Sequence, residues 1–218
     1  AYEDFCANQE AVEKFTLDKP ALICRWRMSN KKVPMLNRHI RALSERLVQG
    51  EPLTHNMLSW AKQHVEWSLA EGDYTARDGV LMLVIDVNGN AAMTVGEYEP
   101  LADTSAKALR ARSAEARSEA DETGVAPELL AAVNNGELAF VAPADECLCG
   151  TATLIEQLAQ TRDMLVTRVD IPAQLKGALF LVSDEHGVVP ANDADAAEAD
   201  AATVAFFADG YEKLRARR

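Results

Sequence analysis

The chain has 218 residues, of which 48% are hydrophobic and 26% are charged, a composition typical of a soluble globular protein. Its 22 basic and 34 acidic residues give a net charge of −12, which argues against nucleic acid and anionic membranes as partners. No apolar run approaches the roughly 18 residues of a membrane-spanning helix. The polar, acidic N-terminus predicts no signal peptide, and four cysteines are too few for a disulfide framework, so we expect reduced thiols in the cytoplasm.

The first hundred residues follow the order strand, strand, helix, helix, strand, strand, which predicts an α+β layer. A short helix or arm over residues 1–19 precedes these elements. Polar capping residues and glycines mark the predicted helix ends. The expected elements are extended pieces over residues 21–28 and 33–36 that form a hairpin, a helix from the Asn37 cap to Gly50, a helix from the Thr54 cap to Gly72, and a hairpin over residues 80–98.

Residues 80–87 are the most informative stretch of this half. Seven of the eight are large and apolar, and Asp86 is the exception, which predicts a central strand buried on both faces. Asn88-Gly89 follows at once, and this pair is typical of a two-residue hairpin turn. Met93 and Val95 then lie on the returning strand. The helices of this half are expected to cover the resulting sheet.

The composition changes after residue 101, so we predict one domain over residues 1–101 and a second over residues 102–218. The segment after residue 101 is rich in alanine and charge, which predicts a solvated helix with almost no core face, ended by Gly124. Further along, the expected elements are a short helical piece over residues 127–133, strands over 137–141, 164–169 and 178–183, a helix over 151–160, a helical turn over 171–175, a flexible loop over 192–201 and a closing helix over 204–214.

Lys107 is the first candidate for chemistry, because small residues surround it and a cofactor could approach there. The alternative is a solvated lysine on a charged helix, which is the more common situation. The chain has no glycine-rich nucleotide motif, nucleophile elbow or HExxH metal motif. Cys147 and Cys149 lack a second pair at zinc-finger spacing, so we predict structural thiols and no metal site. Charges near residues 145 and 184 are interpreted as loop charges.

Several short stretches resemble class IV pyridoxal-phosphate enzymes, the family of branched-chain aminotransferase, D-amino-acid aminotransferase and aminodeoxychorismate lyase. Residues 21–47, ALICRWRMSNKKVPMLNRHIRALSERL, are similar to the opening strand pair and the helix with the HxxRL motif. Residues 147–157, CLCGTATLIEQ, resemble the family's LxGxxR…LIE turn and helix. Residues 179–193, LFLVSDEHGVVPAND, resemble its GVVPV strand. The resemblance implies a two-part α+β architecture, with an N-terminal two-layer α/β sandwich and a smaller C-terminal α/β part.

The resemblance also implies a pyridoxal 5'-phosphate cofactor and positions for its contacts. The Schiff-base lysine would be Lys107, and the phosphate turn would be Gly150, Thr151 and Ala152. The motif's phosphate-binding arginine falls on Ala42, so Arg41 would take that role after a local shift, since one residue turns a helix by about 100°. The carboxylate for the pyridine nitrogen falls near Phe140, which cannot hold a proton.

Three hypotheses for the function follow. The first is a pyridoxal-phosphate aminotransferase or lyase that acts on an amino acid, for which Lys107 must lie in a desolvated cleft. The second is a cofactor-free relative that binds a small molecule or a protein partner. The third is a structural or oligomeric module. The family's sites lie near a dimer interface, and Trp60 and Trp67 lie outside one narrow apolar stripe, so a homodimer is expected.

Overall fold

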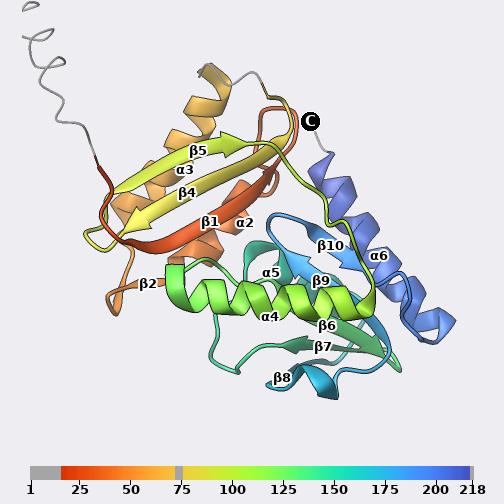
Figure 1. Ribbon diagram of the computed structural model, residues 1–218. Coiled ribbons are helices and arrows are strands. Elements are labelled where there is room, and N and C mark those ends of the chain that lie inside the picture. Colours follow the sequence, from red (N-terminus) through yellow and green to blue (C-terminus); the bar gives the residue numbers. More distant parts are fainter. Residues whose placement is uncertain (1–15, 72–75, 217–218) are drawn as a thin grey trace, which may run out of the picture.

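Two main sheets organise the structure, and each takes its strands from one side of residue 102 (Figure 1). The computed structural model describes residues 16–71 and 76–216, so the arm predicted over residues 1–19 falls mainly outside the described residues. The division into two domains near residue 102 stays a prediction. The elements are β1 (Pro20–Met28), α2 (Leu36–Ser44), β2 (Leu47–Val48), β3 (Glu51–Pro52), α3 (His55–Glu71), β4 (Gly79–Asp86), β5 (Ala91–Gly96), α4 (Ala106–Thr123), β6 (Leu129–Asn134), β7 (Glu137–Val141), α5 (Gly150–Gln160), β8 (Val166–Val169), a 3-10 turn (Pro172–Gln174), β9 (Ala178–Ser183), β10 (Gly187–Pro190) and α6 (Glu198–Arg215).

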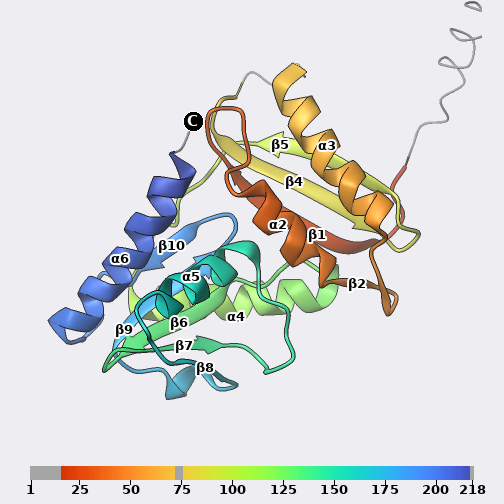
Figure 2. The ribbon, with the colours of Figure 1, turned by 180° about the vertical axis from the view of Figure 1, so that it is seen from behind.

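The N-terminal sheet has the order β1-β4-β5, so the predicted central strand is confirmed. Both pairings are antiparallel, and Leu81 and Leu83 are completely buried against α2 and α3. Met82 and Val84 point to the opposite face and are only half-buried. The prediction of burial on both faces is therefore corrected, because helices cover only one face of this sheet (Figure 2). This half is a two-layer sandwich, as expected.

The predicted hairpin between residues 21–28 and 33–36 does not form. A single bridge joins Ser29 to Lys32, and Leu36 already begins α2. The long strand β1 instead pairs with β4 over nearly its whole length, with Trp26 opposite Leu81. This distant pairing joins two apolar stripes on one sheet face, whereas four residues after a tight turn could bury little surface.

Helix α2 is shorter than predicted and has a different cap. Met35, in the left-handed conformation, precedes it instead of Asn37, and the helix ends at Ser44 rather than at Gly50. The residues that follow form the β2–β3 hairpin, whose turn carries positive φ angles at Gln49 and Gly50. Leu47, which lies within the predicted helix, belongs to β2 and is 54% exposed. Helix α3 does begin at its predicted cap, where the Met57 N–H donates to Thr54 Oγ1.

The C-terminal sheet has five strands in the order β10-β9-β6-β7-β8, and only the β7–β8 pairing is parallel. Helix α4 covers one face of this sheet, and helices α5 and α6 cover the other (Figures 1 and 2). The C-terminal part thus has three layers and the larger sheet, which corrects the expectation of a smaller C-terminal part.

The short helical piece predicted over residues 127–133 is wrong, because these residues form most of strand β6. Leu129 and Val133 point into the cluster under α5 and α6, whereas Leu130 and Ala132 point into the cluster under α4. A strand can bury alternate residues on two faces in this way, and a short isolated run does not reveal which partners it will find. The strands predicted over 137–141, 164–169 and 178–183 and the helix over 151–160 are confirmed, with small shifts of their ends.

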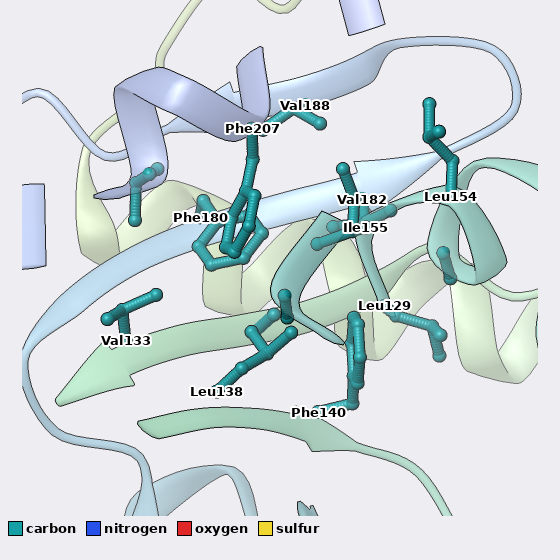
Figure 3. Packing of buried hydrophobic residues seen from close by; sticks show 14 of the residues in the cluster. Leu129, Val133, Leu138, Phe140, Leu154, Ile155, Phe180, Val182, Val188 and Phe207 are labelled. Atoms are coloured by element: carbon teal, nitrogen blue, oxygen red, sulfur yellow. The ribbon is translucent and has the colours of Figure 1, made fainter. Parts of the chain in front are cut away.

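The main core lies between the five-stranded sheet and helices α5 and α6. Figure 3 shows Phe180 of β9 facing Phe207 of α6, and their ring centroids are 6.1 Å apart. Phe140 of β7 and Ile155 of α5 are also completely buried in this cluster. Helix α6 begins at Glu198, inside the loop that was predicted over residues 192–201. The closing helix is therefore longer than its apolar face alone suggested.

Helix α4 is less solvated than predicted. Leu109 is completely buried and Ala116 is 3% exposed, so a narrow stripe of the helix does reach the core. Ser105 caps the first turn, and Gly124 ends the helix where predicted, with a φ of 69°. No helix of the described residues is long and apolar enough to cross a membrane.

Candidate functional site

A cleft separates the N-terminal sheet from the edge of the C-terminal half. Its walls come from β1, α2, α4, the segment before β6, the start of α5 and the turn between β9 and β10, so both halves of the chain contribute. The cavity measures about 40 Å³, which is room for a few water molecules. The cleft therefore accepts only a small ligand or one that stays partly exposed to solvent.

The buried side of the cleft is organised by Asp184, which directly follows strand β9. Its carboxylate accepts hydrogen bonds from the backbone N–H groups of Gly150 (3.3 Å) and Thr151 (2.7 Å), the first two residues of α5. His39 of α2 lies on the other side, with Nδ1 3.3 Å from Asp184 Oδ2, and its ring stacks on Trp26 of β1. Asp184 therefore joins the turn after β9 to both α2 and α5.

The electrostatics of Asp184 show how tightly this carboxylate is held. Burial alone would raise its pKa, but attraction to His39 and the hydrogen bond from the Thr151 N–H outweigh burial and lower the pKa to about 2. The N-terminus of a helix favours a negative charge, because its N–H groups have no partner within the helix. Asp184 thus supplies the anion that the start of α5 favours.

Gly150 is required at this place by the closeness of His39. A Cβ atom on Gly150 would lie 2.5 Å from His39 Nδ1, well inside contact distance. The imidazole therefore packs directly against the start of α5 and fills the space beside it. Thr151 is completely buried there, and its Oγ1 has no hydrogen-bond partner among the described residues.

The open side of the cleft carries paired charges. Both terminal guanidinium nitrogens of Arg25, on β1, donate to the carboxylate of Glu119, on α4, and one of these contacts measures 3.1 Å. The side chains are 28% and 34% exposed, so solvent reaches this pair. Hydrogen bonding with Arg25 lowers the pKa of Glu119. Further along α4, Arg112 donates through Nε and Nη2 to the two oxygens of Glu128, at 2.8 Å each.

Three cysteines line the cleft, and two of them are poor nucleophiles. Burial raises the pKa of Cys24 to about 12 and raises the pKa of Cys149 well above its ordinary value. Both remain protonated at neutral pH, and a thiol is a weaker metal ligand and nucleophile than a thiolate. Cys147 is half-buried, and its Sγ donates to the Glu45 carbonyl at 3.1 Å.

The structure does not bring the predicted Lys107 to this cleft. Lys107 is exposed in the first turn of α4, whereas the part of α4 that lines the cleft begins at Ala116. The two positions are nine residues apart in the helix, which is about 13.5 Å along the axis. Arg41 is likewise exposed and lies on the outer side of α2, beside α3. Their roles as cofactor contacts stay predictions.

The three residues of the predicted phosphate turn do lie together, since Gly150, Thr151 and Ala152 form the buried first turn of α5. However, Asp184 already accepts from the first two N–H groups, so the turn is not free to bind a phosphate. Phe140 is completely buried in the core of the C-terminal half.

Pyridoxal phosphate does not fit the residues as they are arranged. A carboxylate of the chain itself occupies the phosphate donors, and a second anion there would be repelled. No lysine is among the described residues that line the cleft, and the cavity is small.

Sequence reasoning missed the residues that dominate the cleft. Asp184 is among the charges interpreted as loop charges, and no contact between it and His39 was predicted. One signal was available, because Asp184 directly follows a buried strand, where a polar side chain lies at a sheet edge. The pairing with His39 spans 145 positions of the sequence and leaves no local pattern.

No protein-family model matches the chain, and no curated protein matches it in sequence. Solved structures do match its fold. A fold IV-transaminase from Curtobacterium pusillum is 15% identical, with a TM-score of 0.59, and the match covers 90% of this chain and 86% of that one. A Legionella pneumophila protein, proposed to be a 4-amino-4-deoxychorismate lyase, is 11% identical, with a TM-score of 0.60 and coverage of 93% and 97%.

A hypothetical aminotransferase from Mycobacterium tuberculosis, in its PLP-bound form, is 10% identical, with a TM-score of 0.56 and coverage of 93% and 95%. These likenesses show that the chain has the class IV aminotransferase-like fold, and the resemblance in its sequence is confirmed at that level. At such low identity the comparisons show the fold alone.

Proposed function

We propose that this chain is a cofactor-free relative of the class IV aminotransferases that binds a small amino acid in the cleft beside β1. One observation carries the proposal: the Asp184 carboxylate accepts from the Gly150 and Thr151 N–H groups, which a cofactor phosphate would need. The N-terminus of α5 therefore binds a carboxylate of the chain itself and holds the turn after β9 in place. The cleft next to it keeps charged groups that solvent reaches.

The pair of Arg25 and Glu119 favours an amino acid over other small molecules. A guanidinium binds a carboxylate through two parallel hydrogen bonds, and Arg25 already does so with Glu119. A ligand carboxylate can take the place of Glu119, whose own carboxylate then receives the ligand ammonium. An exposed ion pair contributes only about 0–1 kcal/mol, so exchanging it costs little.

Binding of amino acids can be measured by calorimetry on the purified protein. We expect one weak site for small amino acids and at least tenfold weaker binding in Arg25→Gln, since a hydrogen bond to a charged group contributes about 1.5 kcal/mol or more. Arg162→Gln, just beyond the C-terminal end of α5, is the matched control and leaves binding unchanged. Equal affinities of wild type and Arg25→Gln contradict the assignment.

The competing hypothesis is a pyridoxal-phosphate enzyme that uses Lys107, and it is supported by the cofactor in the Mycobacterium tuberculosis structure of similar fold. To decide, wild type, Lys107→Ala and the control Lys176→Ala are incubated with the cofactor and reduced with borohydride. We expect no stoichiometric label on Lys107. A label that disappears only in Lys107→Ala overturns the cofactor-free proposal, whatever the calorimetry gives.

A further inference from the structure

Three potential metal ligands meet where the second sheet borders the cleft. Glu128 directly precedes β6, and Glu185 and His186 lie in the turn between β9 and β10. Strand β9 lies between β10 and β6 in the sheet, so the two segments are close to each other (Figure 1). Their ligand atoms all lie within 4.8 Å of one another. None of the three has a part in the amino-acid contacts proposed above.

His186 presents a buried ring nitrogen that lacks a partner. Its side chain is 3% exposed, and Nε2 has no hydrogen-bond partner among the described residues. The other ring nitrogen, Nδ1, lies 3.3 Å from the Tyr98 hydroxyl. When Nδ1 donates to Tyr98, Nε2 is left as a free acceptor of the kind that binds metals. Buried polar atoms normally have a partner, so this nitrogen points to a missing ligand.

The position of the nearest carboxylate agrees with a shared ion. Glu128 Oε1 lies 3.7 Å from His186 Nε2, which is too far for a direct hydrogen bond. Two ligands that each lie about 2.1 Å from one tetrahedral ion are roughly 3.4 Å apart. The distance between Glu128 Oε1 and His186 Nε2 is thus close to that between two ligands of the same ion.

The charges around the three ligands are mixed, because Arg112 lies beside Glu128 and Arg27 and Arg215 line the cavity next to Glu185 and His186. Arg112 holds both oxygens of Glu128 at 2.8 Å, which fixes the orientation of this carboxylate as partners of metal ligands commonly do. Arg112 offsets one of the two glutamate charges. Among the described residues, Glu185 forms no ion pair within 4.0 Å, so its charge is available to an ion. A cavity of about 140 Å³ next to Glu185 and His186 gives access.

We propose that Glu128, Glu185 and His186 form a binding site for one first-row divalent cation, with Zn²⁺ the best match. One imidazole and two carboxylates suit Zn²⁺, and Mn²⁺ is the second choice because carboxylates dominate the set. Three protein ligands leave a coordination position for water or for a ligand in the cleft. The site does not depend on the proposed amino-acid binding, because it uses neither Arg25 nor Glu119.

The test is calorimetric titration of the chelator-treated full chain with Zn²⁺ and with Mn²⁺, in the absence of amino acids. We expect one ion per chain and at least tenfold weaker binding in both His186→Gln and Glu185→Gln. Cys147→Ser and His64→Gln are matched controls that keep the wild-type affinity. Failure of wild type to bind either ion overturns the proposal, as does unchanged affinity in both site variants or a loss of binding in Cys147→Ser.

Folding of each variant is checked by the urea midpoint of its metal-free form. His186 is buried, so His186→Gln can lose stability for reasons unrelated to an ion. Glu185 lies half-buried in a turn, so Glu185→Gln decides the test when His186→Gln is destabilised. Metal added to wild type should also raise its urea midpoint, because an ion that binds only the folded state stabilises it. No such rise in Glu185→Gln is expected.

Discussion

Replacement of Asp184 by asparagine tests the contacts by which this residue, in the turn after β9, holds α2 and the start of α5. The substitution keeps the size of the side chain but removes its charge and one acceptor, so an amide NH₂ would face a backbone N–H of Gly150 or Thr151. Asp184 has a side-chain exposure of 10%, and solvent therefore screens its interactions little. We expect a loss of folding free energy rather than a local adjustment.

The size of this loss follows from the pKa of Asp184, about 2 against an ordinary value of 3.8. Each unit corresponds to about 1.4 kcal/mol, so the charged form contributes roughly 2 kcal/mol to the free energy of unfolding at neutral pH. Because the folded-state pKa is lowered, this contribution is present above about pH 4 and disappears as the pH falls towards 2. At pH 3 about half of it remains.

Urea unfolding of wild type and Asp184→Asn at pH 7, 4 and 3 measures the difference. Trp26 stacks on His39 in the folded state, so tryptophan fluorescence reports on this region. The stability difference should shrink between pH 4 and pH 3. Asp145→Asn, at an exposed position, is the control and should match wild type throughout. A difference that stays the same at every pH would refute the electrostatic reasoning and indicate a packing defect instead.

Two further predictions concern the helix end at Gly124 and the surface of α3. In Gly124→Ala the new Cβ would lie 1.7 Å from the Ala21 carbonyl oxygen at a positive φ, so we expect a loss of more than about 1 kcal/mol in urea unfolding. Gly136→Ala has a similar φ but open space, and should lose less; an equal loss in both would show that the contact does not matter. Trp67 is 60% exposed and Trp60 38%, so we expect sedimentation to detect a dimer that Trp67→Gln weakens. A 23.7 kDa species alone at high concentration would rule this dimer out.

Only part of the candidate site could be predicted from the sequence. The start of α5 was placed within one residue, because an apolar helix pattern follows Gly150-Thr151, although the N-cap is Cys149. Lys107 was singled out for its small neighbours, but which side of α4 reaches the cleft depends on how the helix packs on β9 and β1. The three ligands proposed for an ion come from positions 128, 185 and 186, and only the pairing of β6 with β9 brings them together.

The sequence by itself determined the elements whose burial pattern is local. The apolar run of β4, the Thr54 cap of α3 and the Gly124 end of α4 each depend on neighbours a few residues away. The chain also turns back at Asn88-Gly89, but the turn is longer than the two residues predicted, because Asp86 pairs with Asn90 and only Gly89 has a positive φ. Tertiary structure decided which strands pair. Strand β1 pairs with β4 rather than with residues 33–36, which follow it in the sequence, and residues 129–134 form a strand between β7 and β9. Tertiary structure also placed Asp184 on the start of α5. The physical reason is that pairing over long separations is selected by total buried surface and matched charges, which no short stretch of the chain contains.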